Sequence, residues 1–273
     1  KFKTCQQSSL QGSKVILEGQ GGDEIAAGYP YVFGSYIQDL MKNNKLSNVK
    51  DEIFNFAKIN NISVNQAFLI IKNGINSYNR NGVSADGTNS VNMDIFNNDF
   101  IQKYDDFNND EDLFESNLLN FQHKDLFKTK LPRILRSCDR ASMAFSTELR
   151  VPLLDHRIVE MMFFLKNEFK INNGIQRYIY RDAIKEITNI NLLNLPKRPV
   201  VDPQLLWFKK DLKDWILDII NSDFVREMPY FNYKKVKSIY NNYIMDNNVK
   251  NSVFIWQIVS MYYWQKTFIK KGI

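Results

Sequence analysis

The segment of this sequence with the clearest capacity for chemistry is a glycine-rich run behind a short apolar stretch. Residues 14–17 read KVIL and 18–24 read EGQGGDE. Glycines let backbone N–H groups approach a phosphate, and a helix that starts there adds the positive end of its dipole. Asp23 could hold Mg²⁺ against pyrophosphate oxygens, because a hard cation prefers carboxylate oxygen. A plain turn with Asp23 as a helix N-cap and Glu24 in the first turn explains the spacing equally well.

A second group of charged residues lies in 135–155, which reads LRSCDRASMAFSTELRVPLLD. Charges among small and apolar residues are costly to bury unless they pair or bind a ligand. Asp139, Arg140, Glu148 and Arg150 are therefore predicted to line a substrate pocket. Mutual arginine–carboxylate pairs that fix a turn are the alternative, and residue types alone slightly favour it.

A third candidate is the pair Arg177 and Arg181 in 173–181, NGIQRYIYR. Residues four apart share a helix face, so the two guanidinium groups could grip one polyphosphate. A solvated basic face is the alternative. Segment 195–204, LPKRPVVDPQ, contains three prolines, and we interpret it as a structural connection into the next helix.

Composition excludes several classes of protein. With 273 residues, 44% hydrophobic and 24% charged, the chain is a globular protein of one large domain or two small ones. Its net charge of +6 comes from interleaved acids and bases, so nucleic-acid binding ranks last. Two cysteines and two histidines exclude a Cys/His metal cage and suit a cytoplasmic location. Neither a membrane span nor a hydrophobic signal segment is predicted.

The pattern predicts one strand followed by a mainly helical body, an α/β fold. The strand at 14–17 reads as buried and parallel, and its partner strands are expected from sequence outside the chain. A helical segment covers 23–41, with a break near 28–30, and 79–110 reads as a surface loop. Further helices are predicted at 113–126, 131–143, 158–165, 176–187, 205–220, 233–245 and 253–268.

In combination these segments resemble one family, the synthetase domain of glutamine-dependent asparagine synthases. The resemblance rests on VILEGQGGDEIAAGY at 15–29, on LPRILRSCDRASMAFSTELRVPLLDHRIVE at 131–160, on NGIQRYIYRDAI at 173–184 and on LPKRPVVDPQ at 195–204. The GQGGDE form looks most like bacterial members from surface-polysaccharide gene clusters. By this resemblance residues 1–273 are the C-terminal portion of that domain: strand and pyrophosphate loop at 1–30, substrate and pyrophosphate helices at 131–204, and C-terminal helices at 205–273.

The resemblance implies a fold and a reaction. The fold would be of the adenine-nucleotide α-hydrolase-like, ATP-pyrophosphatase type, with most parallel strands missing. ATP would activate aspartate as β-aspartyl-AMP, and glutamine-derived ammonia would displace AMP to give asparagine. ATP and Mg²⁺ are the implied cofactors.

The resemblance also assigns roles. Glu18 and Gly19 match nucleotide contacts, and Asp23 matches the Mg²⁺–pyrophosphate carboxylate. Arg177 matches a pyrophosphate-contacting lysine, and Gln20 stands where the asparagine-forming enzymes carry a glutamate linked to forming or using the aspartyl intermediate. By this resemblance Gln20, Asp23 and Arg177 are the expected catalytic residues. The glycine-loop argument adds Gly21 and Gly22 as phosphate-binding residues, and the helix-face argument adds Arg181.

The family's Ser-Gly-Gly-x-Asp-Ser loop and its glutaminase domain do not occur in these residues. We therefore interpret the chain as the C-terminal part of a longer protein and expect it to be inactive alone. A homodimer is one assembly that the protein could form. Two alternatives stay open: a related amidoligase acting on another carboxylate, and a catalytically silent helical binding module.

Overall fold

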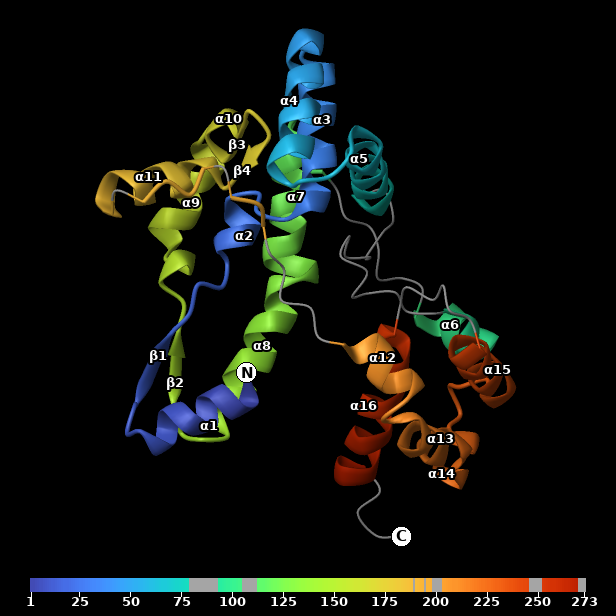
Figure 1. Cartoon of the computed structure of the whole chain (residues 1–273). Coiled ribbons are helices and arrows are strands. Elements are labelled where there is room, and N and C mark those ends of the chain that lie inside the picture. Colours follow the sequence, from blue (N-terminus) through green and yellow to red (C-terminus); the bar gives the residue numbers. More distant parts are fainter. Residues whose placement is uncertain are drawn as a thin grey trace. The chain divides into compact units, whose positions relative to one another are not determined.

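The computed structural model describes residues 1–78, 93–104, 112–188, 190–193, 195–197, 203–245 and 252–269 (Figure 1). The chain divides into two compact units. Unit 1 comprises Lys1–Ala85 and Glu111–Arg198, and unit 2 comprises Asp86–Asp110 and Pro199–Ile273. Unit 1 contains every residue that the sequence selects for chemistry.

Unit 1 is mostly helical, with two very small sheets. Its elements in chain order are α1 (Phe2–Leu10), β1 (Val15–Leu17), α2 (Gly22–Ile25), η1 (Pro30–Val32), α3 (Phe33–Lys42), α4 (Leu46–Ile59), α5 (Val64–Tyr78), α7 (Asn117–Lys124), η4 (Asp125–Thr129), α8 (Leu131–Met143), β2 (Glu148–Arg150), η5 (Pro152–Leu154), α9 (His156–Phe164), α10 (Asn167–Lys170), β3 (Ile171–Asn172), β4 (Ile175–Gln176) and α11 (Tyr178–Thr188). The prediction of a mostly helical α/β chain is therefore confirmed.

Strand β1 finds its partner within the chain, which corrects the expectation of a lone strand. It pairs in parallel with β2, and Val15 lies opposite Glu148 in the register. Parallel strands end at the same edge of a sheet, so the glycine turn after β1 lies beside the segment after β2. The expected burial is also wrong, because Val15 and Leu17 are 38% and 70% exposed.

The helices of unit 1 form where the sequence supplies caps and apolar faces. Ser116 caps α7 by accepting a hydrogen bond from the N–H of Leu119, and Asp155 caps α9 in the same way. A proline in the first turn opens α8. Helices α3, α4, α5 and α7 (Figure 1) share one core. In it the rings of Phe33 and Phe56 stack 4.2 Å apart.

A smaller core holds the helix that carries the glycine turn. Ile25 and Ala26, at the end of α2, pack against Leu126, Leu131 and Met162. These partners belong to η4, α8 and α9. The short helix α2 is therefore fixed by tertiary packing, since four residues are too few to form a stable helix in isolation.

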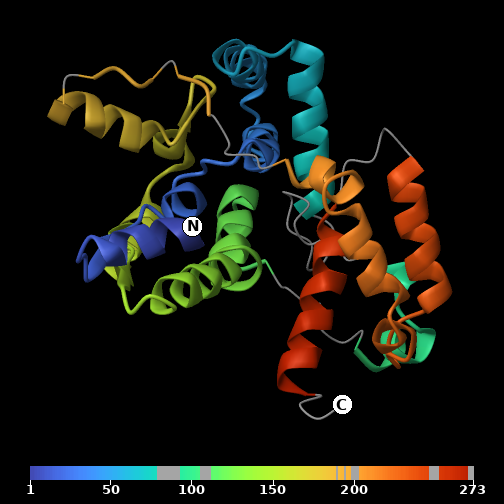
Figure 2. The same ribbon diagram turned by 60° about the horizontal axis from the view of Figure 1, so that its bottom comes forward.

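Unit 2 is a separate helical bundle. It contains η2 (Met93–Ile95), α6 (Asn98–Tyr104), α12 (Gln204–Lys209), α13 (Lys213–Asn221), α14 (Asp223–Arg226), α15 (Tyr233–Met245) and α16 (Val253–Phe268). Figure 2 shows the red helix α16 among the orange helices of this unit. Its core includes buried residues of α13, α15 and α16, and the Tyr240 hydroxyl donates to the carbonyl of Phe208.

Three predicted helices have the observed bounds, namely those at 131–143, 233–245 and 253–268. The break near 28–30 is also present, between α2 and η1. The helix predicted at 205–220 is instead two helices, because Lys210 leaves the helical conformation. Of the predicted loop at 79–110, residues 93–104 contain η2 and α6, and the rest lies outside the described residues. No helix in the described ranges is long and apolar enough to cross a membrane.

Candidate functional site

The turn after β1 requires glycine at position 21, and at position 22 it leaves little room for a larger residue. Gly21 has φ +91°, and a β-carbon there would collide with the side chain of Leu154. A β-carbon on Gly22 would lie 2.8 Å from Leu153. Gly19 faces open space, so its lack of a side chain has no steric cause in the described residues. The turn is thus shaped by its packing against η5, the segment that follows β2.

Asp23 forms the centre of a charged cluster. Its Oδ1 lies 3.3 Å from Nη1 of Arg177, and its Oδ2 accepts a 2.7 Å hydrogen bond from Nζ of Lys197. The three side chains are 25%, 31% and 16% exposed. Segments more than 150 positions apart in the sequence therefore meet at one half-buried point. Asp23 and Arg177, which the resemblance matches separately to the pyrophosphate, therefore lie together.

Lys197 is the member of this cluster that the sequence analysis missed. Its ammonium group also lies 4.0 Å from the centroid of the Tyr29 ring. Burial lowers the pKa of Lys197, and the Asp23 carboxylate opposes that shift. The available signal was a lysine just after Pro196, within a segment that resembles the family. We interpreted that segment only as a connection.

Aromatic rings support the cations beside Asp23. The ring of Tyr29 stacks on that of Tyr31, with centroids 5.1 Å apart. Nζ of Lys130 lies 3.5 Å from the Tyr29 centroid. The Tyr29 hydroxyl donates a 2.8 Å hydrogen bond to Glu24, and burial with that neighbouring carboxylate raises the pKa of Tyr29. Ammonium groups over ring faces gain cation–π stabilisation, so lysine side chains are held in place here.

Two buried glutamines fix the backbone around Asp23. Gln122 donates through Nε2 to the carbonyl of Glu24, while its Oε1 accepts a hydrogen bond from Nζ of Lys170. Gln176 donates through Nε2 to the carbonyls of Ala27 and Tyr29. Each amide satisfies buried polar atoms, which would otherwise cost about 1–3 kcal/mol apiece. The loop that carries Asp23 is therefore anchored to α7 and to β4.

Gly28 makes room for the ion pair. A β-carbon at this position would overlap Oδ1 of Asp23 and would lie 2.9 Å from Cδ of Arg177. The backbone N–H of Gly28 also donates to the carbonyl of Asp23. A side chain at Gly28 and the observed Asp23–Arg177 geometry are therefore incompatible.

We expect Gly28→Ala to weaken binding of magnesium pyrophosphate by on the order of 100-fold, because the added methyl group displaces a charged side chain. Titration calorimetry of the purified protein would measure the dissociation constant. The melting temperature of Gly28→Ala is the control for folding, since an unchanged value would show that the weaker binding does not come from unfolding. An unchanged dissociation constant in Gly28→Ala would show that the Asp23–Arg177 arrangement does not matter for the anion.

Arg181 has a different role from the predicted one. Its Nη1 donates to the carbonyls of Leu192, Leu193 and Leu195 at 2.7, 3.3 and 2.6 Å. The shared helix face is also wrong, because α11 begins at Tyr178 and Arg177 has φ +56° in front of it. Arg181 instead holds in place the segment that leads to Lys197.

The four residues predicted to line a substrate pocket are exposed. Asp139 and Arg140 lie on α8, and Glu148 and Arg150 lie on β2. Arg150 Nε donates a 2.9 Å hydrogen bond to Glu148, which lowers the pKa of that carboxyl group. This is the mutual pairing that the residue types favoured, and the pocket assignment stays a prediction.

The remaining predicted residues lie along the turn. Glu18 is half-buried, and its Oε2 lies 2.6 Å from Nζ of Lys1. Its backbone N–H donates to the carbonyl of Arg150, which extends the β1–β2 pairing. Gln20 is half-buried and Gly19 is exposed. Glu18 and Gly19, which are predicted to contact the nucleotide, thus directly precede Gln20 and the glycine turn.

Similarity to known proteins identifies the family. A family model described as asparagine synthase matches residues 1–266. The chain belongs to the asparagine synthase family. It is 28% identical over 156 residues to asparagine synthetase (glutamine-hydrolyzing) 1 of Bacillus subtilis. The matched residues make up 57% of this chain and 24% of that protein. It is 30% identical over 89 residues to asparagine synthetase (glutamine-hydrolyzing) 3 of the same species, with 33% and 14% covered. The chain thus spans about a quarter of the first relative's length. No solved structure matches it.

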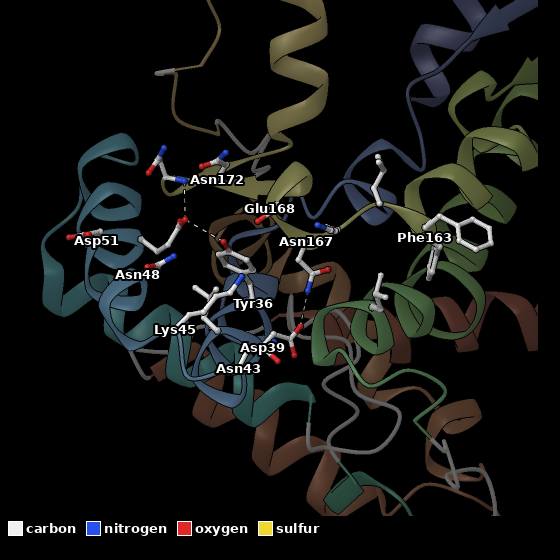
Figure 3. A pocket seen from close by; sticks show the side chains of 17 residues that line it. Tyr36, Asp39, Asn43, Lys45, Asn48, Asp51, Phe163, Asn167, Glu168 and Asn172 are labelled. Atoms are coloured by element: carbon white, nitrogen blue, oxygen red, sulfur yellow. Dashed lines mark hydrogen bonds between the residues drawn. The ribbon is translucent and has the colours of Figure 1, made fainter.

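The chain also has a polar pocket of about 790 Å³ between α3, α4 and segment 163–173 (Figure 3). Its two buried carboxylates are satisfied within the fold. Glu52 accepts hydrogen bonds from the backbone N–H of Gly174, and Asp39 accepts one from Asn167. Burial raises the pKa of Glu52. The pocket contains none of the predicted site residues, and its hydrogen bonds fix α4 to the hairpin β3–β4.

Proposed function

We propose that the chain carries the pyrophosphate-binding part of an ATP-dependent ligase that converts aspartate to asparagine. The observation that supports this most is the convergence of Asp23, Arg177 and Lys197. One carboxylate and two cations, all partly removed from water, suit a polyanion that arrives with a metal ion. Membership of the asparagine synthase family makes the triphosphate of ATP the proposed anion.

The first step places charge where the two cations lie. An oxygen of the aspartate β-carboxylate attacks the α-phosphorus of ATP, which forms β-aspartyl-AMP and releases pyrophosphate. Negative charge builds on the departing pyrophosphate, and fixed cations stabilise that charge better than mobile water does. Arg177 offers a planar fork and Lys197 a compact point charge. Ammonia then attacks the β-carbonyl carbon, and AMP leaves.

The residues present fit a magnesium ion. The described residues contain no group of three or more histidine, cysteine or carboxylate side chains that could enclose a metal. Mg²⁺ does not need one, because it commonly binds one or two carboxylates, substrate phosphates and water. Asp23 supplies such a carboxylate, and its buried Oδ1 accepts no hydrogen bond in the described part of the chain. When bound, the ion would neutralise charge on the phosphate oxygens.

The other substrates and partners belong to the same proposal. Glutamine would supply the ammonia through a glutaminase domain in the rest of the protein, and these 273 residues alone would not make asparagine. Glu18, Gly19, Gly21 and Gly22 would face the nucleotide. The adenine-nucleotide α-hydrolase-like fold, the cytoplasmic location and a homodimer remain proposals.

Gln20 favours a second candidate, in which the same adenylation chemistry modifies another carboxylate. A neutral amide can donate a hydrogen bond but cannot act as a base. Where the asparagine-forming enzymes carry a glutamate, the handling of the aspartyl intermediate would therefore differ. Pyrophosphate release measured against a panel of carboxylic acids separates the two, since only one acid should stimulate it strongly.

Lys197→Met tests the proposal directly. In the whole protein that carries this chain, we expect aspartate-dependent exchange of pyrophosphate into ATP to fall by on the order of 100-fold. Lys197→Arg should recover part of the rate, because it keeps the charge. Lys166→Met is the control, since Lys166 is exposed in the same unit. Exchange at the wild-type rate in Lys197→Met, with an unchanged melting temperature, would refute the proposed function.

A further inference from the structure

Tyr180 lies beside the turn that carries Asp23. It occupies the first turn of α11, three residues after Arg177. Its Cε2 lies 3.7 Å from the position that a β-carbon of Gly22 would take. Cε2 neighbours the ring carbon that carries the hydroxyl, so the hydroxyl-bearing half of the ring lies beside Gly22. The ring also packs against the core that contains Ile25 and Ala26.

The hydroxyl of Tyr180 has no hydrogen-bond partner among the described residues, although it is buried. Two further buried atoms without such a partner are Oδ1 of Asp23 and Nε of Arg177. In the described ranges five side-chain atoms share this property, and three of them belong to this one site. Nearly all buried polar groups in native proteins are paired, so this concentration points to a ligand that supplies the missing partners.

The unpaired donors define what that ligand must offer. Burial raises the pKa of Tyr180 to about 12, so its hydroxyl keeps its proton at neutral pH and can donate it. The Nε–H of Arg177 is a second unpaired donor. The ammonium of Lys197 already donates to Asp23 and, with three N–H bonds, can donate to a ligand as well. The donors need a ligand with many acceptor oxygens. The carboxylate of Asp23 needs a cation, which such a ligand would bring with it.

We propose that the hydroxyl of Tyr180 donates a hydrogen bond to a phosphoryl oxygen of the polyphosphate held by Arg177 and Lys197. This inference rests on the proposed function, because it takes the anion site from there. It adds a neutral donor from α11 to the two cations of the site. A hydrogen bond to a charged group is stronger than one between neutral groups, so Tyr180 should matter for affinity.

Tyr180→Phe removes the hydroxyl and keeps the ring that packs beside Gly22. In the whole protein that carries this chain, we expect the dissociation constant for magnesium pyrophosphate to rise at least tenfold, measured by titration calorimetry. The melting temperature should stay equal or rise, because the lost hydroxyl has no partner within the fold. The Michaelis constant for aspartate should not change.

Tyr36→Phe is the matched control. The Tyr36 hydroxyl is buried and donates to Glu52 at 3.3 Å, away from the Asp23 cluster. This variant should lower the melting temperature and leave pyrophosphate binding unchanged. The two variants should therefore give opposite results: Tyr180→Phe weakens pyrophosphate binding without lowering the melting temperature, and Tyr36→Phe lowers the melting temperature without weakening binding.

Each outcome bears on a different claim. If the wild type does not bind magnesium pyrophosphate at all, the proposed function and this inference both fail. If the wild type binds it, Lys197→Met binds it weakly and Tyr180→Phe binds it normally, only the role of Tyr180 is wrong. A lowered melting temperature in Tyr180→Phe, or a change confined to the Michaelis constant for aspartate, would also overturn the phosphoryl contact.

Discussion

Replacing Asp23 with asparagine should lower pyrophosphate release by on the order of 1,000-fold while the protein stays folded. Asparagine keeps the shape of the side chain but loses the charge that would bind Mg²⁺ and that now balances Arg177 and Lys197. A coupled assay for pyrophosphate, run on the whole protein with ATP and aspartate, measures the effect. Excess Mg²⁺ should restore little of the rate, because the charged ligand itself is absent.

The competing view of Asp23 as a helix cap makes a different forecast. The N-cap of α2 is Gly21, and the Asp23 side chain bonds Lys197 instead of the helix backbone. Asp155 does cap a helix, so Asp155→Ala is the control: it should cost about 0.5–2 kcal/mol of stability and leave pyrophosphate binding intact. Aggregation or a large loss of stability in Asp23→Asn, with normal release by the folded fraction, would contradict the catalytic assignment.

Lys170→Met should remove a strong dependence of stability on pH. Lys170 is fully buried, and its ammonium donates to Gln122. Burial lowers the pKa of Lys170 to about 7 from 10.5. Between these values the unfolded chain binds a proton that the folded protein does not, so stability rises with pH across that window. The contribution approaches 1.4 kcal/mol per pH unit.

Chemical denaturation of the wild type and of Lys170→Met at pH 7, 8 and 9 checks this expectation. The difference in unfolding free energy between the two proteins should move in favour of the wild type by about 2 kcal/mol over the series. Lys166→Met, which changes an exposed lysine of the same unit, should show no such trend. A constant difference for Lys170→Met across the series would mean that the pKa of Lys170 is close to its ordinary value.

Local sequence patterns predicted the elements whose causes are local. The helices at 131–143 and 253–268 have long apolar patterns, and their bounds are confirmed. The glycine turn after β1 could be predicted because glycine is favoured where the backbone has a positive φ, as it has at Gly21. Strand β2 was missed because three residues are too few for an alternating pattern to be recognised.

The site itself was only half predictable for a related reason. Asp23, Arg177 and Lys197 all stand in segments that resemble the family, but the segment of Lys197 is interpreted from its prolines as a connection, and the role of this lysine depends on a contact 174 residues away in the sequence. Arg181 looked like a second anion ligand because spacing reports a shared helix face and not what the side chain meets. From the sequence alone Lys170 is predicted to lie at the surface, because lysine is rarely fully buried.

The grip of Arg181 on main-chain oxygens has an evolutionary consequence. Its guanidinium binds the carbonyl groups of Leu192, Leu193 and Leu195, and every amino acid offers the same carbonyl. Mutations in that stretch can therefore accumulate freely as long as the chain keeps its path. Among homologues we expect a drifting, poorly alignable stretch bounded by an arginine and a lysine that hardly vary, a contrast that an alignment of diverged members would reveal.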